Sequence, residues 1–264
     1  MLRAVRSELI KLSRWSVLAG GAAMIAATAG WSYFAVNRAT TGASMSRQLV
    51  QALRTPQGLI TLVGAAEPFI TAIAIITVAA NVAAEWSQGT LRNLLVREPG
   101  RLRLLGGKVL ALLFFVTVSA ALALLAGAGI TLLAAQSHGI STAPWTSSDG
   151  VNTFFSFFGN ELLGLVGVSL LGICIAVLTR STAGAVGISL AYVLVVEGLV
   201  DSLWPDGAEW LPAHIFGYLP GTASPMSYGA PPMGYDSDLI VALLWMIGFV
   251  VVSAVLFRFR DVSA

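Results

Sequence analysis

Three glutamates within long apolar stretches are the residues in this sequence whose type and placement could do chemistry. Glu67, Glu161 and Glu197 are each flanked by mostly apolar residues. An acidic side chain at the centre of a bilayer costs about 2.5–3.5 kcal/mol, so such residues usually face a cavity and mark a pathway. We take all three as candidate pathway residues for a cationic or proton-coupled cargo. The alternative is a structural role, in which each carboxyl is protonated and hydrogen-bonded between helices.

Other chemistry has little support in the residue types. The only histidines, His138 and His214, lie far apart in regions predicted to be loops, and the only cysteine, Cys174, lies in an apolar run. We therefore predict no metal site, no catalytic residues and no disulfide. A membrane-embedded enzyme is the less favoured class, because Ser169 and Ser189 have no evident base beside them.

The nearest approach to a phosphate-binding loop also fails. The run Gly106-Gly107-Lys108 is followed by Val109 where Ser or Thr is required, and Leu102 occupies the position of the first glycine. We expect this chain to bind no cofactor and to lack ATPase activity of its own.

The elements that position these residues are predicted to be transmembrane helices. Hydrophobic residues make up 56% of the 264 residues and charged residues only 11%, against about 25% charged in soluble domains. Spanning helices need about 20 mostly apolar residues. Six segments qualify, giving an all-α integral membrane fold in one transmembrane domain, 1–264. They are roughly 16–36, 58–84, 108–135, 154–178, 183–203 and 239–257.

Basic residues predict how the helices are oriented. Most of the 15 Lys and Arg residues fall on the side that holds the N-terminus, and only Arg38, Arg47 and Arg54 fall on the other. By the positive-inside rule both termini are cytoplasmic. On this arrangement the three glutamates lie about nine, seven and six residues from the outer ends of their helices, at similar depth. The expected location is a bacterial plasma membrane, as a multi-pass protein.

Three segments between or before the spans have distinct roles. Residues 1–15 place apolar side chains on one helical face and basic ones elsewhere, which predicts an amphipathic interface helix; a simple positive flank is the alternative. The polar stretch 85–108 predicts a structured inner loop. The stretch 204–237 is rich in aromatic residues and prolines, so we expect part of it to re-enter the outer membrane interface.

The inner loop resembles that of the type-2 permeases of ATP-binding-cassette (ABC) exporters, frequent in actinobacterial drug-export systems. In that family span two ends in an acidic residue, a Gly-Thr-Leu-Arg run and then Pro and Arg follow, and a Lys precedes span three. The matching residues here are Glu85, Gly89, Thr90, Leu91, Arg92, Pro99, Arg101 and Lys108. The opening of the chain and the long outer loop are also similar to the family's.

The resemblance implies a permease subunit that exports a drug, lipid or other small amphiphile. Its partners would be a dimer of a separate ABC ATPase subunit, which holds the ATP and Mg²⁺, a second permease copy or paralogue, and membrane lipid, with no nucleic acid. The expected ATPase contact residues are Glu85, Gly89, Thr90, Leu91, Arg92, Leu94 and Arg101. The alternative is a proton-coupled secondary transporter that uses the three glutamates.

Overall fold

The structure is a computed structural model that describes residues 15–41, 52–90, 100–221 and 233–259. Within these ranges the regular elements are all helical. Among the described residues, six helical segments are long and apolar enough to cross a membrane, which confirms the predicted all-α architecture with six candidate spans. The expected interface helix 1–15 falls almost entirely outside the described residues, as do residues 91–99 of the predicted inner loop.

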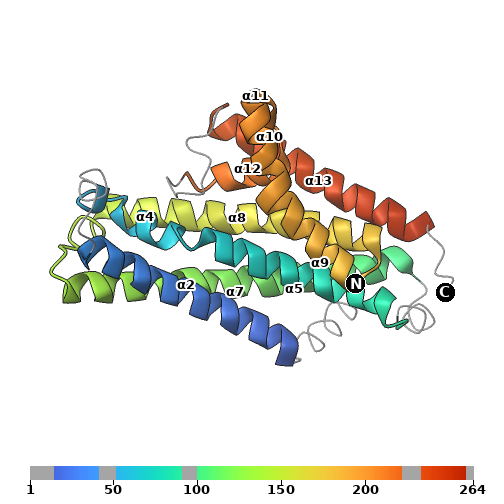
Figure 1. Ribbon diagram of the computed structural model, residues 1–264, viewed down its shortest axis with the longest axis horizontal. Coiled ribbons are helices and arrows are strands. Elements are labelled where there is room, and N and C mark those ends of the chain that lie inside the picture. The colour runs from blue at the N-terminus through green and yellow to red at the C-terminus, as the bar shows by residue number, and fades with distance from the viewer. Residues whose placement is uncertain (1–14, 42–51, 91–99, 222–232, 260–264) are drawn as a thin grey trace.

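The six spans lie close to their predicted positions. They are α2 (Trp15–Thr41), α5 (Glu67–Ser87), α7 (Arg101–Ser137), α8 (Ser148–Thr179), the continuous segment of α9 (Thr182–Ala191), η1 (Tyr192–Val196) and α10 (Glu197–Leu203), and α13 (Tyr235–Phe259). The long helices α7 and α8 run along the length of the bundle (Figure 1). The start of α2 and the end of α13 both point toward the end of the bundle where α7 begins.

Two boundaries differ from the prediction for physical reasons. The second span is divided into α4 (Gly58–Gly64) and α5, with Pro68 in the first turn of α5; proline has no N–H to continue the hydrogen-bond ladder of a preceding helix. The helix α7 begins directly after Gly100, seven residues earlier than the predicted span. Glu85 and Lys108 therefore belong to α5 and α7, and the inner loop between them is shorter than 85–108.

Serine caps begin two of the spans. Ser147 Oγ accepts a hydrogen bond from the Gly150 amide at the start of α8, and Ser181 Oγ accepts one from the Gly184 amide at the start of α9. Each bond satisfies an amide that has no partner within its helix.

The connection between α8 and α9 consists of two residues, Arg180 and Ser181. Arg180 takes a left-handed conformation with φ of 54°, and the chain reverses direction at this turn.

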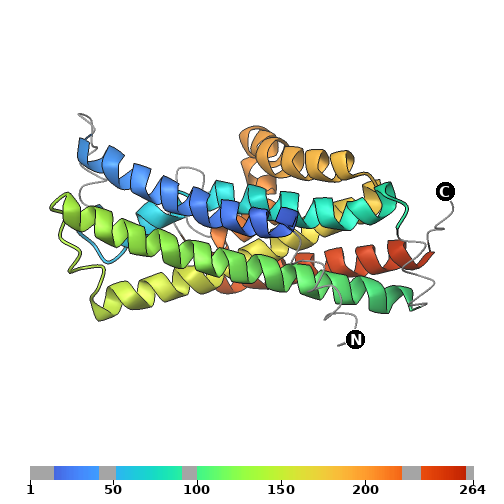
Figure 2. The ribbon, with the colours of Figure 1, turned by 90° about the horizontal axis from the view of Figure 1, so that it is seen from below.

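Small side chains set the helix spacing in the larger part of the bundle. The helices α2 and α7 cross closely, with Gly21 against Ser119 and Gly127 against Thr28. Close approach through small residues is the usual basis of helix association in lipid. This packing forms one buried core among α2, α4, α5, α7 and α8, while a second core joins α8 to α12 and α13. Figure 2 shows α2 lying beside α7 in the bundle.

The segment after α10 folds back onto the bundle. The short helices α11 (Pro205–Ala208) and α12 (Pro212–Tyr218) follow α10 in the chain, and α12 packs against α8 and α13. All seven residues of α12 are buried. The predicted segment 204–237 thus contains a helix held against the spans, together with the first turn of α13; residues 222–232 lie outside the described chain.

Candidate functional site

A pocket of about 70 Å³ lies among α5, α8, η1 and α12. Two of the three predicted pathway glutamates line it, Glu67 at the start of α5 and Glu161 in the middle of α8. The remaining lining is mostly apolar and includes Pro68, Leu165, Val168, Val193, Leu194 and Phe216, with Thr71 as an additional polar side chain. The fold therefore brings Glu67 and Glu161, 94 positions apart in sequence, to one cavity.

Two irregular stretches of helix border this pocket. The second span breaks between α4 and α5 directly before Glu67. Across the pocket, the fifth span widens into the π-helical turn η1, which supplies Val193 and Leu194. π-turns inside α-helices cost stability and occur frequently at functional sites. Their meeting at the same cavity as two acidic side chains makes this pocket the best candidate site.

The two carboxyl groups in the pocket have little compensation from the protein. Glu161 is only 3% exposed, and Oε2 of Glu67 is buried without a hydrogen-bond partner. No Lys, Arg or His belongs to the residues that line the pocket. Since an unpaired carboxylate in a low-dielectric surrounding is strongly disfavoured, these groups need a proton or a cation.

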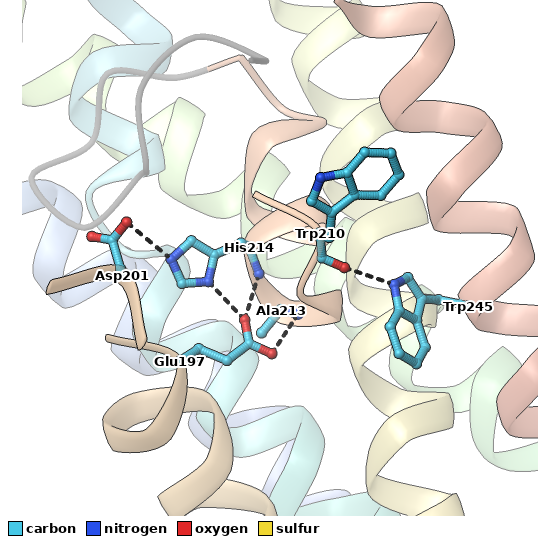
Figure 3. Close-up of polar contacts among 6 residues, drawn as sticks. All are labelled: Glu197, Asp201, Trp210, Ala213, His214 and Trp245. Carbon is cyan, nitrogen blue, oxygen red and sulfur yellow. Dashed lines mark hydrogen bonds and ion pairs between the residues drawn. The ribbon is translucent and has the colours of Figure 1, made fainter. Parts of the chain in front are cut away.

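The third glutamate has a different environment. Glu197 is fully buried, and its Oε1 accepts a hydrogen bond of 2.9 Å from the Ala213 amide. Its Oε2 accepts one of 2.8 Å from the His214 amide and lies 2.8 Å from Nδ1 of the same histidine (Figure 3). Glu197 does not line the pocket, although Ala213 does. Its carboxylate holds α12 against the fifth span.

His214 is the residue that the sequence interpretation missed. It was expected in an outer loop, but it is fully buried on α12. Its ring lies between two carboxylates of α10, with Nδ1 at Glu197 and Nε2 3.9 Å from Asp201 (Figure 3). The one available signal was a histidine within an unusually apolar loop. The pairing itself depends on α12 folding back, which no local pattern reveals.

A further contact joins the segment between α11 and α12 to α13. Trp245 of α13 donates a 3.0 Å hydrogen bond from Nε1 to the carbonyl of Trp210 (Figure 3). Burial, and then the negative charges of Asp201, Glu209 and Asp238, raise the pKa of the Tyr218 phenol on α12.

Four of the predicted ATPase-contact residues belong to the described chain and lie near the end of α5 and the start of α7. Glu85 of α5 and Lys108 of α7 form an ion pair of 2.6 Å, with side chains 14% and 10% exposed. Gly89 and Thr90 are exposed just beyond α5. Arg101 donates a 3.3 Å hydrogen bond to the carbonyl of Arg258, joining α7 to the end of α13. The other three residues, Leu91, Arg92 and Leu94, lie outside the described residues.

Comparison with known proteins gives a family assignment. A search of curated proteins found no match. Residues 43–263 match the family described as "Protein of unknown function (DUF2705)", and this range covers five of the six spans and both glutamates of the pocket. Because the match extends over most of the sequence, the chain belongs to the DUF2705 family.

Proposed function

We propose that this protein is the transmembrane permease subunit of an ABC exporter in a bacterial plasma membrane. It would move a drug, lipid or other small amphiphile outward and would be powered by a separate ATPase subunit. The chain itself would bind no nucleotide, because the sequence lacks a phosphate-binding loop.

The observation that carries the proposal is the pairing of Glu85 with Lys108. These are the acidic and basic residues that flank the Gly-Thr-Leu-Arg run in the resemblance to type-2 permeases. Their ion pair is 2.6 Å long and mostly buried, so it fixes the ends of α5 and α7 next to each other. A push on the intervening segment would be transmitted directly to two spans, as an ATPase-driven permease requires.

The pocket supports a transport role for the same helices. Its acidic groups lie on α5 and α8, and α5 also carries Glu85 at its other end. A rigid-body movement of α5 would therefore connect the ATPase side to the environment of Glu67. Such a connection between a driven end and a polar site inside the bundle is expected of alternating access.

Co-purification from the native membrane tests this proposal. A tagged chain extracted in mild detergent should carry a stoichiometric soluble ATPase. We expect Arg92→Glu to abolish this association and Arg54→Glu, an exposed arginine at the other end of the bundle, to leave it intact. A well-folded preparation without an ATPase, or one that keeps it in Arg92→Glu, would refute the proposal.

A proton-coupled secondary transporter is the second candidate. The specific observation in its favour is that Glu67 and Glu161 line one pocket whose lining contains no Lys, Arg or His. Reconstitution into liposomes distinguishes the two functions. A secondary transporter would move substrate in response to a pH gradient without any ATPase, and substitutions at Arg92 and Leu94 would leave most of that activity.

A further inference from the structure

We propose that the pocket between α5, α8, η1 and α12 binds the ammonium head of a lipophilic monoamine, whose apolar tail lies beside Val193 and Leu194. This inference rests on the proposed function and names its cargo class. Its basis is the combination of two acidic side chains, apolar walls and a lining residue, Leu194, that is 49% exposed.

The charge balance of the pocket favours a single positive charge. Glu161 is only 3% exposed, and no Lys, Arg or His lines the pocket beside it. Glu67 contributes a buried oxygen that lacks a hydrogen bond. One of the two groups would be ionised and would pair with a monovalent cation. The other would stay protonated and would donate a hydrogen bond to the ionised carboxylate. A doubly charged ligand would need both groups ionised in close proximity, which their mutual repulsion opposes.

The composition of the walls favours an organic cation over a metal ion. Calcium takes six to eight oxygen ligands and magnesium requires an octahedral set. The pocket offers two carboxyl groups and Thr71, and the rest of its side chains are apolar. The described residues contain no group of three or more metal-ligating side chains. Methyl and methylene groups next to an ammonium nitrogen would instead pack on Leu165, Val168 and Phe216.

The size of the pocket indicates how such a ligand would lie. A volume of about 70 Å³ is far below the roughly 300–1,000 Å³ of sites that enclose a drug-sized molecule. Only the head of an amphiphile fits inside. Leu194 lines the pocket and is 49% exposed, and its helix is one of the six apolar spans. The tail would leave the pocket at this residue and continue along the lipid-facing surface of the fifth span.

Equilibrium binding to the permease alone tests the inference. The probe is radiolabelled N,N-dimethyldodecylamine, which is protonated at neutral pH, added to purified protein in phosphatidylcholine nanodiscs, with empty discs as the background. We expect saturable binding of one amine per chain. Competition by unlabelled amine should be complete, whereas 1-dodecanol, which has the same chain without the charge, should not compete.

Substitutions in the pocket give the decisive comparison. Glu161→Gln should weaken binding about tenfold or more, since it removes one charge from a buried pair, and the double variant Glu67→Gln with Glu161→Gln should abolish it. Asp149→Asn, an exposed acid in the first turn of the same helix, is the matched control and should bind as the wild type does. Thermal unfolding of each variant checks that the fold is retained.

The outcomes separate this inference from the proposed function. Binding to empty discs and protein-containing discs alike, or equal binding to the double variant and the wild type, would overturn the amine site. Because the assay contains no ATPase, amine binding by a protein that co-purifies with no ATPase would support the site while refuting the exporter. If an ATPase co-purifies with the permease but the permease does not bind the amine, the exporter would be supported and the amine site refuted.

Discussion

At the scale of single residues, the three glutamates that lie in apolar stretches of the sequence occupy two different environments in the structure. Glu67 and Glu161 face a cavity without a basic partner, whereas Glu197 accepts three short contacts from two consecutive residues of α12. The difference lies in what each carboxyl meets across the helix interface. The first two carboxyl groups border the open space of the pocket, while that of Glu197 is already paired within the protein.

Replacing Glu197 by glutamine should destabilise the outer segment. The side-chain NH₂ of the glutamine cannot accept a hydrogen bond. In one orientation it would face the backbone N–H of Ala213, and in the other the backbone N–H and ring of His214. A buried donor left without its acceptor costs about 1–3 kcal/mol. We expect a lower thermal unfolding temperature in detergent and faster proteolysis in the α10–α12 region.

The matched control for this change is Glu209→Gln. Glu209 is a partly exposed acid at the end of α11, so its substitution should change the unfolding temperature little. Equal unfolding temperatures for Glu197→Gln and the wild type would show that the Glu197 contacts contribute no stability.

At the scale of elements, the position of α12 depends on two glycines of α8. A Cβ atom on Gly164 would lie 2.5 Å from the carbonyl oxygen of Phe216, and one on Gly167 would overlap the ring of Phe216. Backbone atoms cannot yield as a flexible side chain can, so α12 approaches α8 this closely only because both positions lack a side chain. Since Phe216 and Gly164 also line the pocket, the same contact determines the pocket's shape.

Gly164→Ala should therefore displace α12 and weaken the fold by about 1–3 kcal/mol, as overpacking does elsewhere. Gly159→Ala is the control on the same helix, because a Cβ there meets nothing within 4 Å; it should be neutral or slightly stabilising, since alanine favours helix more than glycine. Thermal unfolding in detergent measures both. If the two variants unfold at the same temperature, the close contact between α8 and α12 is not rigid.

At the scale of the whole molecule, different segments form the two ends of the bundle. The Glu85–Lys108 pair lies where α5 ends and α7 begins, while the turn between α7 and α8 lies at the opposite end of the bundle (Figure 1). The proposed function requires the first end to be cytoplasmic. The distribution of basic residues favours the same orientation.

Cysteine labelling in cells measures this orientation directly. Cys174 is the only cysteine and is buried, so Cys174→Ser provides a background for single cysteines. A membrane-impermeant maleimide should label Ser141→Cys in intact cells and should label Gln88→Cys only after the membrane is permeabilised; both positions are exposed. The reverse pattern would invert the orientation and place the proposed ATPase contact outside the cell.

The sequence by itself determined the membrane class and the six spans. Both follow from short-range physics, because apolar residues in lipid must satisfy their backbone groups within one helix. The intramembrane glutamates could also be identified, because a charge in an apolar run is visible without any contact. Their similar predicted depth depended only on the rise per residue.

Only the tertiary structure decided which of these acids share a site. Glu67 and Glu161 meet because α5 packs on α8, and Glu197 is excluded because α12 folds back and places His214 and two amides on it. These partners are 16 and 17 positions apart and belong to different helices. No periodicity encodes how a short, proline-rich segment docks, since its position is set by close packing against Gly164 and Gly167 and by buried hydrogen bonds that exist only in the folded chain.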